Sequence, residues 1–229
     1  MKIAIIGAGN MGGAIARGLA HSNMDIKIAV ADLAQDKLDE LKAECDAIEV
    51  STDSLTIVAD ADVVLVAVKP WLVEPVLKGA LPALDLSRQI ILSIAAGVEI
   101  ATITSWLGNE QAVVFRAIPN TAISIHQSMT FVSYNANATA HQVAQVEAIF
   151  NALGKAAVIE ERLMGAATSL CSCGIAFAMR YVRAATEGGV ELGIYPNDAK
   201  QYVLQTLRGA VELLEATGNN LARSLCLFD

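Results

Sequence analysis

The chain has 229 residues, of which 54% are hydrophobic and 17% charged, and its formal net charge is −8. A nucleic-acid-binding surface needs a basic face, so this charge balance argues against a nucleic-acid partner. No unbroken apolar run approaches the roughly 18 to 20 residues of a membrane span, and the first residues lack the pattern of a secretory signal. We therefore expect a cytoplasmic protein without a membrane partner.

The four cysteines are Cys45, Cys171, Cys173 and Cys226, and in a cytoplasmic protein they are expected to be reduced. Cys171 and Cys173 are separated by one residue, but no other Cys or His pair has the spacing of metal ligands. Because a structural metal site usually needs four ligands, we expect no metal.

The first 160 residues alternate short apolar strands with helical patterns. The helices expected between the strands lie at residues 11–19, 34–45, 99–108 and 143–154, the last with Gly154 at its C′ position. This alternation predicts βαβ units and a mostly parallel, doubly wound Rossmann-type α/β sheet. The predicted strands are residues 2–6, 26–32, 61–68, 89–97, 112–119 and 130–134.

The pattern changes near residue 160. From Arg162 onwards no strand is predicted, and two long helices are expected, over residues 163–187 and from residue 196 to Gly218. We therefore predict two domains, an α/β dinucleotide-binding domain at residues 1–160 and a smaller all-α C-terminal domain at residues 161–229. The apolar stripe of the last helix consists of Val203, Leu207, Ala210, Val211 and Leu214.

A glycine-rich motif follows the first predicted strand. Residues 7–12 read Gly-Ala-Gly-Asn-Met-Gly, the spacing G-x-G-x-x-G between a strand and a helix. Gly7 permits the tight turn, Gly9 lets the backbone approach a pyrophosphate, and Gly12 lets the helix pack closely on the strand. A plain glycine-rich turn is the alternative. The residues expected to bind a dinucleotide here are Gly7, Ala8, Gly9, Asn10 and Met11.

An acidic residue closes the second predicted strand. Asp32 lies twenty residues after Gly12, where Rossmann-type domains bind the ribose hydroxyls of the cofactor. Its negative charge would repel the 2′-phosphate of NADP, and no Arg stands next to it. We therefore expect NAD(P)H as the cofactor, with NADH favoured. The alternative role of Asp32 is to cap the helix that follows.

Four segments occur in an order that resembles the pyrroline-5-carboxylate reductase family: GAGNMGGAIARGL, AVKP, SIAAGV and RAIPNT. The resemblance extends over residues 1 to about 218. It implies a Rossmann domain followed by helices that form an interleaved homodimer. It also implies that a hydride passes from NAD(P)H to the C=N carbon of 1-pyrroline-5-carboxylate, giving L-proline in the last step of proline biosynthesis.

The same resemblance implies further site residues. Lys69 is expected to lie along the cofactor or to attract the substrate carboxylate, and Asn120 to hydrogen-bond the nicotinamide edge or the substrate. The alternatives are a solvated charge for Lys69 and a turn role for Asn120. Ser54 is expected at the adenosine end, or as a helix cap. The remaining cofactor residues are Ala67, Val68 and Pro70, and also Ala95, Ala96 and Gly97, whose alternative role is close helix packing.

The chain also departs from the family. A family stretch resembling SGSGPAY is CSCGIAF here, in which Ser172 and Gly174 keep the small character. The family's SPGGTT-like loop and last helices are not found, and Ala122 follows RAIPNT where Pro is common. A missing carboxylate clamp removes hydrogen bonds worth about 1.5 to 3 kcal/mol each, so weaker substrate binding is expected.

The expected catalytic residues are Lys69, Asn120 and Ser172. Two alternatives to a pyrroline-5-carboxylate reductase remain open at this point. One is a related NAD(P)-dependent reductase of another imino or hydroxy acid, suggested by the altered helical segment. The other is a dinucleotide-binding protein with impaired catalysis, suggested by the loop that is not found.

Overall fold

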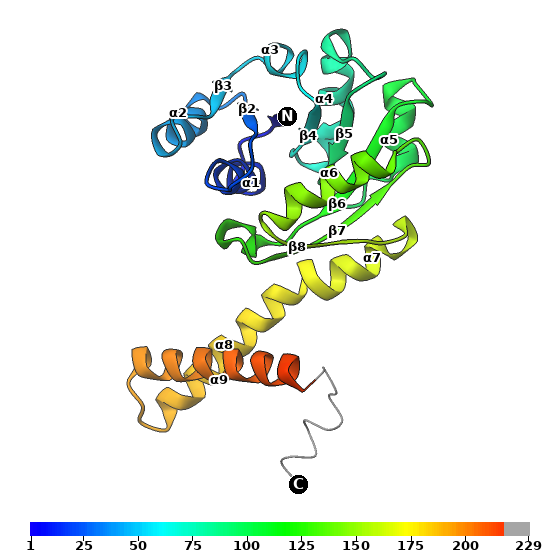
Figure 1. Ribbon diagram of the computed structural model, residues 1–229. Coiled ribbons are helices and arrows are strands. Elements are labelled where there is room, and N and C mark those ends of the chain that lie inside the picture. The colour runs from blue at the N-terminus through cyan, green and yellow to red at the C-terminus, as the bar shows by residue number, and fades with distance from the viewer. Residues whose placement is uncertain (218–229) are drawn as a thin grey trace. The chain divides into compact units, whose positions relative to one another are not determined.

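The computed structural model describes residues 1–217 and divides the chain into two compact units, Met1–Cys173 and Gly174–Asp229. The first unit contains an eight-stranded sheet of order β3-β2-β1-β4-β5-β6-β7-β8 (Figure 1). All neighbouring strands pair in parallel except β6 and β7, which are antiparallel. The predicted mostly parallel, doubly wound fold is therefore confirmed. The strands are β1 (Lys2–Ile6), β2 (Lys27–Ala31), β3 (Glu49–Ser51), β4 (Val63–Val66), β5 (Ile90–Ser93), β6 (Val113–Ile118), β7 (Ser128–Tyr134) and β8 (Gly154–Val158).

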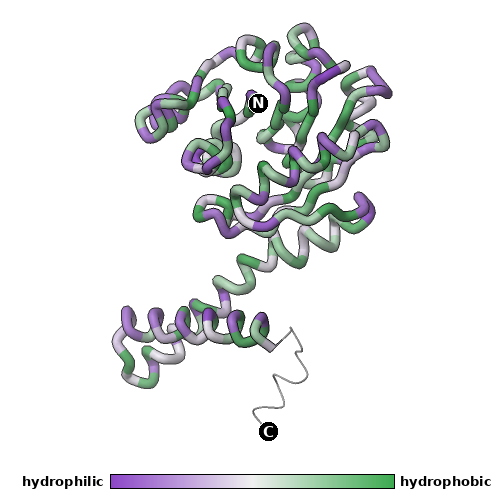
Figure 2. The backbone as a smooth tube through the Cα atoms, in the orientation of Figure 1, coloured by the Kyte–Doolittle hydropathy of each residue, from purple (hydrophilic) through white to green (hydrophobic). Residues whose placement is uncertain are grey.

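Helices cover both faces of the sheet, which explains the continuous apolar runs of its central strands. Ile3 and Ile5 of β1 belong to one hydrophobic cluster, whereas Ala4 and Ile6 belong to another. Hydrophobic residues accordingly concentrate along the central strands in Figure 2. The first cluster includes residues of α1 (Asn10–Ala20), α2 (Gln35–Glu44) and α6 (Ala140–Asn151), and the second includes residues of α3 (Ser54–Val58), α4 (Val73–Ala80) and α5 (Ile100–Leu107).

The edge strands β3 and β8 were not predicted. β8 has the sequence GKAAV, and each of its residues is half-buried or exposed, so it lacks the apolar pattern of a buried strand. The prediction for Gly154 was also wrong, because α6 ends at Asn151 with Ala152 as its cap. Gly154 instead begins β8 with a φ of 144°, and a Cβ there would lie 2.2 Å from the Ser128 carbonyl oxygen.

Short helical segments complete the first unit, and the described part of the second unit consists of two long helices. The predicted helix over residues 163–187 is observed as a succession of helical segments ending at Glu191. The last helix begins at Pro196, as its Pro-Asn-Asp start predicted. These elements are η1 (Pro70–Leu72), η2 (Leu81–Ala83), η3 (Thr121–Ile125), η4 (Glu161–Leu163), α7 (Met164–Ala167), the π-helical η5 (Thr168–Ser172), α8 (Gly174–Glu191) and α9 (Pro196–Ala216).

One helical stretch in the described part of the chain, Glu161–Glu191, is long and apolar enough to cross a membrane by length and composition alone. Only 11% of its most apolar window is buried. A core helix of a soluble protein passes the same test of length and composition, so one such helix is weak evidence for a membrane span. No residue of α8 is buried, and in α9 only Ala199 is.

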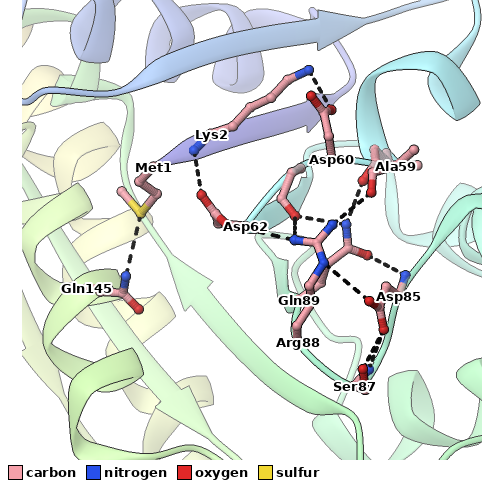
Figure 3. Close-up of polar contacts among 12 residues, drawn as sticks. Met1, Lys2, Ala59, Asp60, Asp62, Asp85, Ser87, Arg88, Gln89 and Gln145 are labelled. Carbon is pink, nitrogen blue, oxygen red and sulfur yellow. Dashed lines mark hydrogen bonds and ion pairs between the residues drawn. The ribbon is translucent and has the colours of Figure 1, made fainter.

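Polar side chains at the amino ends of the strands form hydrogen bonds and ion pairs with their neighbours (Figure 3). Gln89 is fully buried, and its Nε2 donates to the carbonyl oxygens of Val58 (2.6 Å) and Ala61 (2.9 Å). Its Oε1 accepts a hydrogen bond of 2.8 Å from the backbone N–H of Asp85. Every polar atom of this amide therefore has a partner, which is the condition for burying it.

A lysine at the same end of the sheet pairs with exposed carboxylates. Lys2 Nζ donates to Asp60 Oδ1 at 2.7 Å and lies 3.3 Å from Glu49 Oε2. The hydrogen bond from Lys2 lowers the pKa of Asp60. Burial opposes the charge of Lys2, but its bonds to the two carboxylates outweigh that effect and raise its pKa.

We predict that Gln89→Leu destabilises the first unit, because it removes the hydrogen bonds to the carbonyl oxygens of Val58 and Ala61 and leaves the N–H of Asp85 without its partner. The expected cost is about 2 to 3 kcal/mol, which corresponds to a fall in Tm of about 4 to 12 °C for a chain of this size. Thermal unfolding followed by circular dichroism measures it. Gln111→Leu, at an exposed glutamine, is the control and is expected to leave Tm nearly unchanged. An unchanged Tm in Gln89→Leu would contradict the buried role.

Candidate active site

A cavity of about 830 Å³ opens at the carboxyl ends of the parallel strands in the first unit. Ligands of open α/β sheets bind at this edge, where the strand order reverses, and here the reversal lies between β1 and β4. The volume is within the range of about 300 to 1,000 Å³ typical of small-molecule sites. The sequence-predicted residues on its wall are Gly7, Gly9, Asn10, Met11, Asp32, Ser54, Ala67, Val68, Lys69, Pro70, Ala95, Ala96 and Ser172.

The three motif glycines have different surroundings. A Cβ at Gly12 would lie 2.0 Å from the carbonyl oxygen of Gly7, so α1 can approach β1 only with glycine there. Gly7 has a φ of 112°, which favours glycine. A Cβ at Gly9 would meet no atom within 4 Å, and Gly9 lines the cavity. Packing within the protein therefore does not require glycine at position 9, and the missing side chain leaves room for a ligand.

The helix that follows the glycines presents its N-terminus to the cavity. Gly9 is the N-cap of α1, and no acidic residue occupies its first turn. Asn10 and Met11 of that turn line the cavity. The positive end of the helix dipole and the backbone N–H groups are therefore available to an anion such as a pyrophosphate.

The carboxylate of Asp32 is held by two backbone donors. Its Oδ2 accepts from the N–H of Ala8 at 2.7 Å, and its Oδ1 accepts from the N–H of Ala34 at 2.9 Å. Ala8, which is not among the residues lining the cavity, thus joins the glycine turn to the end of β2. The N-cap of α2 is Ala34, without a side-chain cap. Each carboxylate oxygen can accept more than one hydrogen bond, so Asp32 retains acceptor capacity for ribose hydroxyls.

Three residues near Asp32 were missed in the sequence. Leu33, Lys37 and Thr52 line the same cavity. Thr52 follows the unpredicted strand β3, so its signal was hidden with that strand. Ser54 also lines the cavity, at the first position of α3, while the cap of that helix is Asp53, whose carboxylate accepts from the Leu55 N–H at 2.9 Å. The capping alternative for Ser54 is therefore wrong.

The loops after β4 and β5 form the next part of the wall. Lys69 is exposed and precedes η1 as its N-cap, so its ammonium can reach an anionic ligand. Ala95 and Ala96 lie on the wall, and their small side chains leave it flat. Gly97 is not on the wall; it has a φ of 78°, which suits a turn.

The side chain of Asn120 is occupied within the protein. Asn120 is 7% exposed and is the N-cap of η3, where its Oδ1 accepts from the Ala122 N–H at 3.0 Å. Its Nδ2 donates to the Cys171 carbonyl oxygen at 3.4 Å. Ile118 and Pro119 line the cavity beside it, whereas Asn120 does not. These contacts fit the turn role, and a contact between Asn120 and a ligand stays a prediction.

The far wall comes from the helical segment after η4. Thr168 and Ser172 line the cavity, and both belong to the π-helical η5, a type of distortion frequent at functional sites. Thr168 Oγ1 donates to the Met164 carbonyl oxygen at 2.7 Å. Ser172 is half-buried and lines the cavity, so a ligand there can contact this residue.

Three of the four cysteines lie within the described residues. Cys45, Cys171 and Cys173 are free thiols, and burial raises the pKa of the Cys45 thiol. Cys226 lies outside the described residues. Within residues 1–217, no group of three or more His, Cys, Asp or Glu side chains is arranged to hold a metal ion.

Two family models match the chain. One, described as "NADP oxidoreductase coenzyme F420-dependent", matches residues 2–97, and the other, "Pyrroline-5-carboxylate reductase dimerisation", matches residues 161–226. Pyrroline-5-carboxylate reductases 1 and 2 of Dictyostelium discoideum are each 34% identical to it over 93% of this chain. The chain spans 40% of the first of these relatives and 76% of the second.

Solved structures show the same similarity. A pyrroline-5-carboxylate reductase from Coxiella burnetii has a TM-score of 0.90 and 28% identity, over 99% of this chain and 84% of that one. A Plasmodium falciparum pyrroline carboxylate reductase with NADP bound has a TM-score of 0.84 and 25% identity, over 94% of this chain and 79% of that one.

We predict that alanine separates the roles of two motif glycines. Gly9→Ala is expected to keep Tm within about 2 °C but to weaken dinucleotide binding at least about tenfold, because the new methyl occupies ligand space. Gly12→Ala is expected to lower Tm, because its Cβ would overlap Gly7. Thermal unfolding and a fluorescence titration with NADH measure the two effects. A Gly9→Ala variant that binds as tightly as the parent would contradict this assignment.

Proposed function

The chain belongs to the pyrroline-5-carboxylate reductase family, and on that premise we propose that it reduces the C=N bond of 1-pyrroline-5-carboxylate to give L-proline. It is an oxidoreductase that uses NAD(P)H. The observation that carries this function is the continuity of one cavity, from Asp32 and the glycine turn at one end to Thr168 and Ser172 at the other. A dinucleotide and a small imino acid fit such an arrangement end to end.

We assign the cofactor contacts from the chemistry of the wall. The N-terminus of α1, with Gly9, Asn10 and Met11, suits the pyrophosphate. Asp32 suits a ribose, and Ser54 the adenosine beyond it. Ala95 and Ala96 leave space for the flat nicotinamide ring near Ser172. The remaining contacts proposed on this wall are Gly7, Ala67, Val68, Lys69 and Pro70. Ala8, Gly97 and Asn120 do not line the cavity, and their contact with the cofactor stays a prediction.

The chain's own residues bind and orient the substrate. Reduction adds a hydride to the carbon of the protonated C=N bond, whose π electron pair moves to the nitrogen and leaves a neutral secondary amine; NAD(P)H would supply that hydride when bound. The exposed ammonium of Lys69 attracts the substrate carboxylate. The hydroxyl of Ser172 hydrogen-bonds the nitrogen atom of the substrate's C=N bond. Asn120, whose amide contacts Cys171, supports the wall that carries this serine.

We divide the chain by function at residue 160. Dinucleotide binding is assigned to residues 1–160, and dimerisation with substrate binding to residues 161–229. Residues 161–173 pack within the first unit, yet they lie in the segment that matches the dimerisation family. Residues 218–229, where the family's carboxylate-binding loop was not found, lie outside the described residues.

NADH is the proposed preferred form of the cofactor. The charge of Asp32 is fixed in the cavity by two backbone N–H groups, and it disfavours a second negative charge nearby. Lys37 on the same wall moderates this repulsion, so some use of NADPH is expected.

We predict that Asp32→Asn raises the ratio of kcat/KM for NADPH over NADH by about tenfold. Asparagine removes the charge but keeps an oxygen that can accept from the Ala8 N–H, so the glycine turn retains its support. Steady-state oxidation of both cofactors with pyrroline-5-carboxylate measures the ratio. Asp36→Asn, at an exposed aspartate in the first turn of α2, is the matched control. A parent enzyme that already prefers NADPH would overturn the proposed preference.

The match to the dimerisation family supports oligomerisation, and we propose a homodimer formed through α8 and α9. Val203, Leu207 and Leu214 of α9 are half-buried. Val211, in contrast, is 57% exposed, and other large apolar residues of this unit are exposed with it. A second copy that covers them explains an apolar helix pair in a cytoplasmic protein. The exposed apolar residues that such a copy would cover include Phe177, Met179, Tyr181, Leu192, Tyr195, Tyr202, Leu204 and Leu213.

We predict that Val211→Glu weakens self-association at least about tenfold, since it buries a charge in the proposed interface. Size-exclusion chromatography with light scattering over a concentration series measures the dimer. Gln201→Glu adds the same charge at an exposed polar position of α9 and is expected to leave the dimer intact. A monomeric parent, or a Val211→Glu variant that dimerises normally, would refute the interface.

A further inference from the structure

The segment Glu161–Ser172, which comprises η4, α7 and η5, is called the helical wall below. A buried arginine of β6 pairs with its first residue. Arg116 is 6% exposed, and its Nη1 lies 3.1 Å from Glu161 Oε1. Its buried Nε makes no hydrogen bond within the described part of the chain. The guanidinium thus depends on Glu161 for charge compensation, and burying an arginine without it is unfavourable.

The same carboxylate binds a third element. Glu161 Oε1 also accepts from the N–H of Ile100 at 2.8 Å, and Ile100 is the first residue of α5. One oxygen therefore joins β6, α5 and η4. Ile100 and Glu161 are also among the residues that line a second hollow. The Glu161 side chain is 32% exposed, so it is in contact with water.

The helical wall is attached at further points beyond Glu161. Met164 and Ala167 are buried, and ten residues after Glu161 the Cys171 carbonyl accepts from Asn120. Arg116 and Asn120 both belong to the segment RAIPNT, so one short stretch supports this wall at two places. Thr168 lies between these two attachment points in the chain, and Ser172 directly follows the second. Both residues line the cavity.

We propose that Glu161 and Arg116 are positioning residues, whose ion pair fixes the wall formed by Thr168 and Ser172 against the sheet. Neither side chain lines the main cavity, so they act through the helical segment and not by contact with a ligand. The inference about substrate binding rests on the proposed reductase function. The inference about the order of the wall does not.

The first test is hydrogen exchange in the full chain with Glu161→Gln. Exchange of the backbone amides of residues 168–172 is expected to quicken about tenfold or more, because the segment opens more often. Glu160→Gln is the matched control, since Glu160 pairs with Arg162 at the surface and should leave this exchange unchanged. Equal exchange in Glu161→Gln and the parent would overturn the proposal. This readout needs no turnover, so it stands even if pyrroline-5-carboxylate is not the substrate.

The second test separates positioning from general stability. In Glu161→Gln, KM for pyrroline-5-carboxylate is expected to rise about tenfold, while the Kd for NADH stays within about twofold. A variant with lower Tm but the parent's KM would show a merely structural pair and overturn the proposal. A parent that does not reduce this imine would instead refute the proposed function alone.

A conservative pair of variants covers the case in which Glu161→Gln does not fold. Arg116→Lys keeps the positive charge and is expected to retain KM and the exchange of residues 168–172 near those of the parent. Arg116→Met removes the charge from a side chain of similar reach and is expected to behave like Glu161→Gln. Identical exchange in the lysine and methionine variants would contradict the role of the ion pair.

Discussion

The close approach of α1 to the end of β1 is the constraint on which the cofactor site depends. A Cβ at Gly12 would lie 2.0 Å from the Gly7 carbonyl oxygen and 2.9 Å from Ala67 Cβ. Without that Cβ, the helix N-terminus can lie directly over the strand end where β1 separates β2 from β4. The free N–H groups and the dipole then point into the cavity, and the Asp32 carboxylate joins the same turn through Ala8. Fold and binding chemistry are therefore determined at one contact.

The two ends of the sheet differ in what their polar groups do. At the amino ends, Gln89, Arg88 and Lys2 use their hydrogen bonds on neighbouring backbone and carboxylates, so this end is stabilised and chemically closed. At the carboxyl ends, Asp32, Lys69 and Ser172 keep donors or acceptors free for a ligand. This separation lets the hydrogen-bonded amino end support side chains at the other end that still have donors or acceptors for a ligand.

On the proposed function, the helical segment after residue 160 serves both the substrate site and the dimer interface. Its first turns pack on the sheet through Met164 and Ala167 and present Thr168 and Ser172 to the cavity. Its later helices carry large apolar side chains that two helices cannot bury between themselves. The proposed substrate wall and the proposed self-association surface therefore belong to one continuous stretch of chain.

The sequence by itself determined the strands buried on both faces, the glycine turn and Asp32, because these signals are local: apolar runs, small residues at fixed spacing, and an acid at a strand end. It did not reveal β3 or β8, since edge strands are short and half-exposed, nor Thr52, which follows β3. Only the tertiary structure showed that Gly154 of β8 lies against the backbone of Ser128 in β7, where a Cβ would overlap it. It alone also showed that Asn120 contacts Cys171 and that Arg116 meets Glu161, because these partners are 51 and 45 residues apart and no local pattern records such pairings.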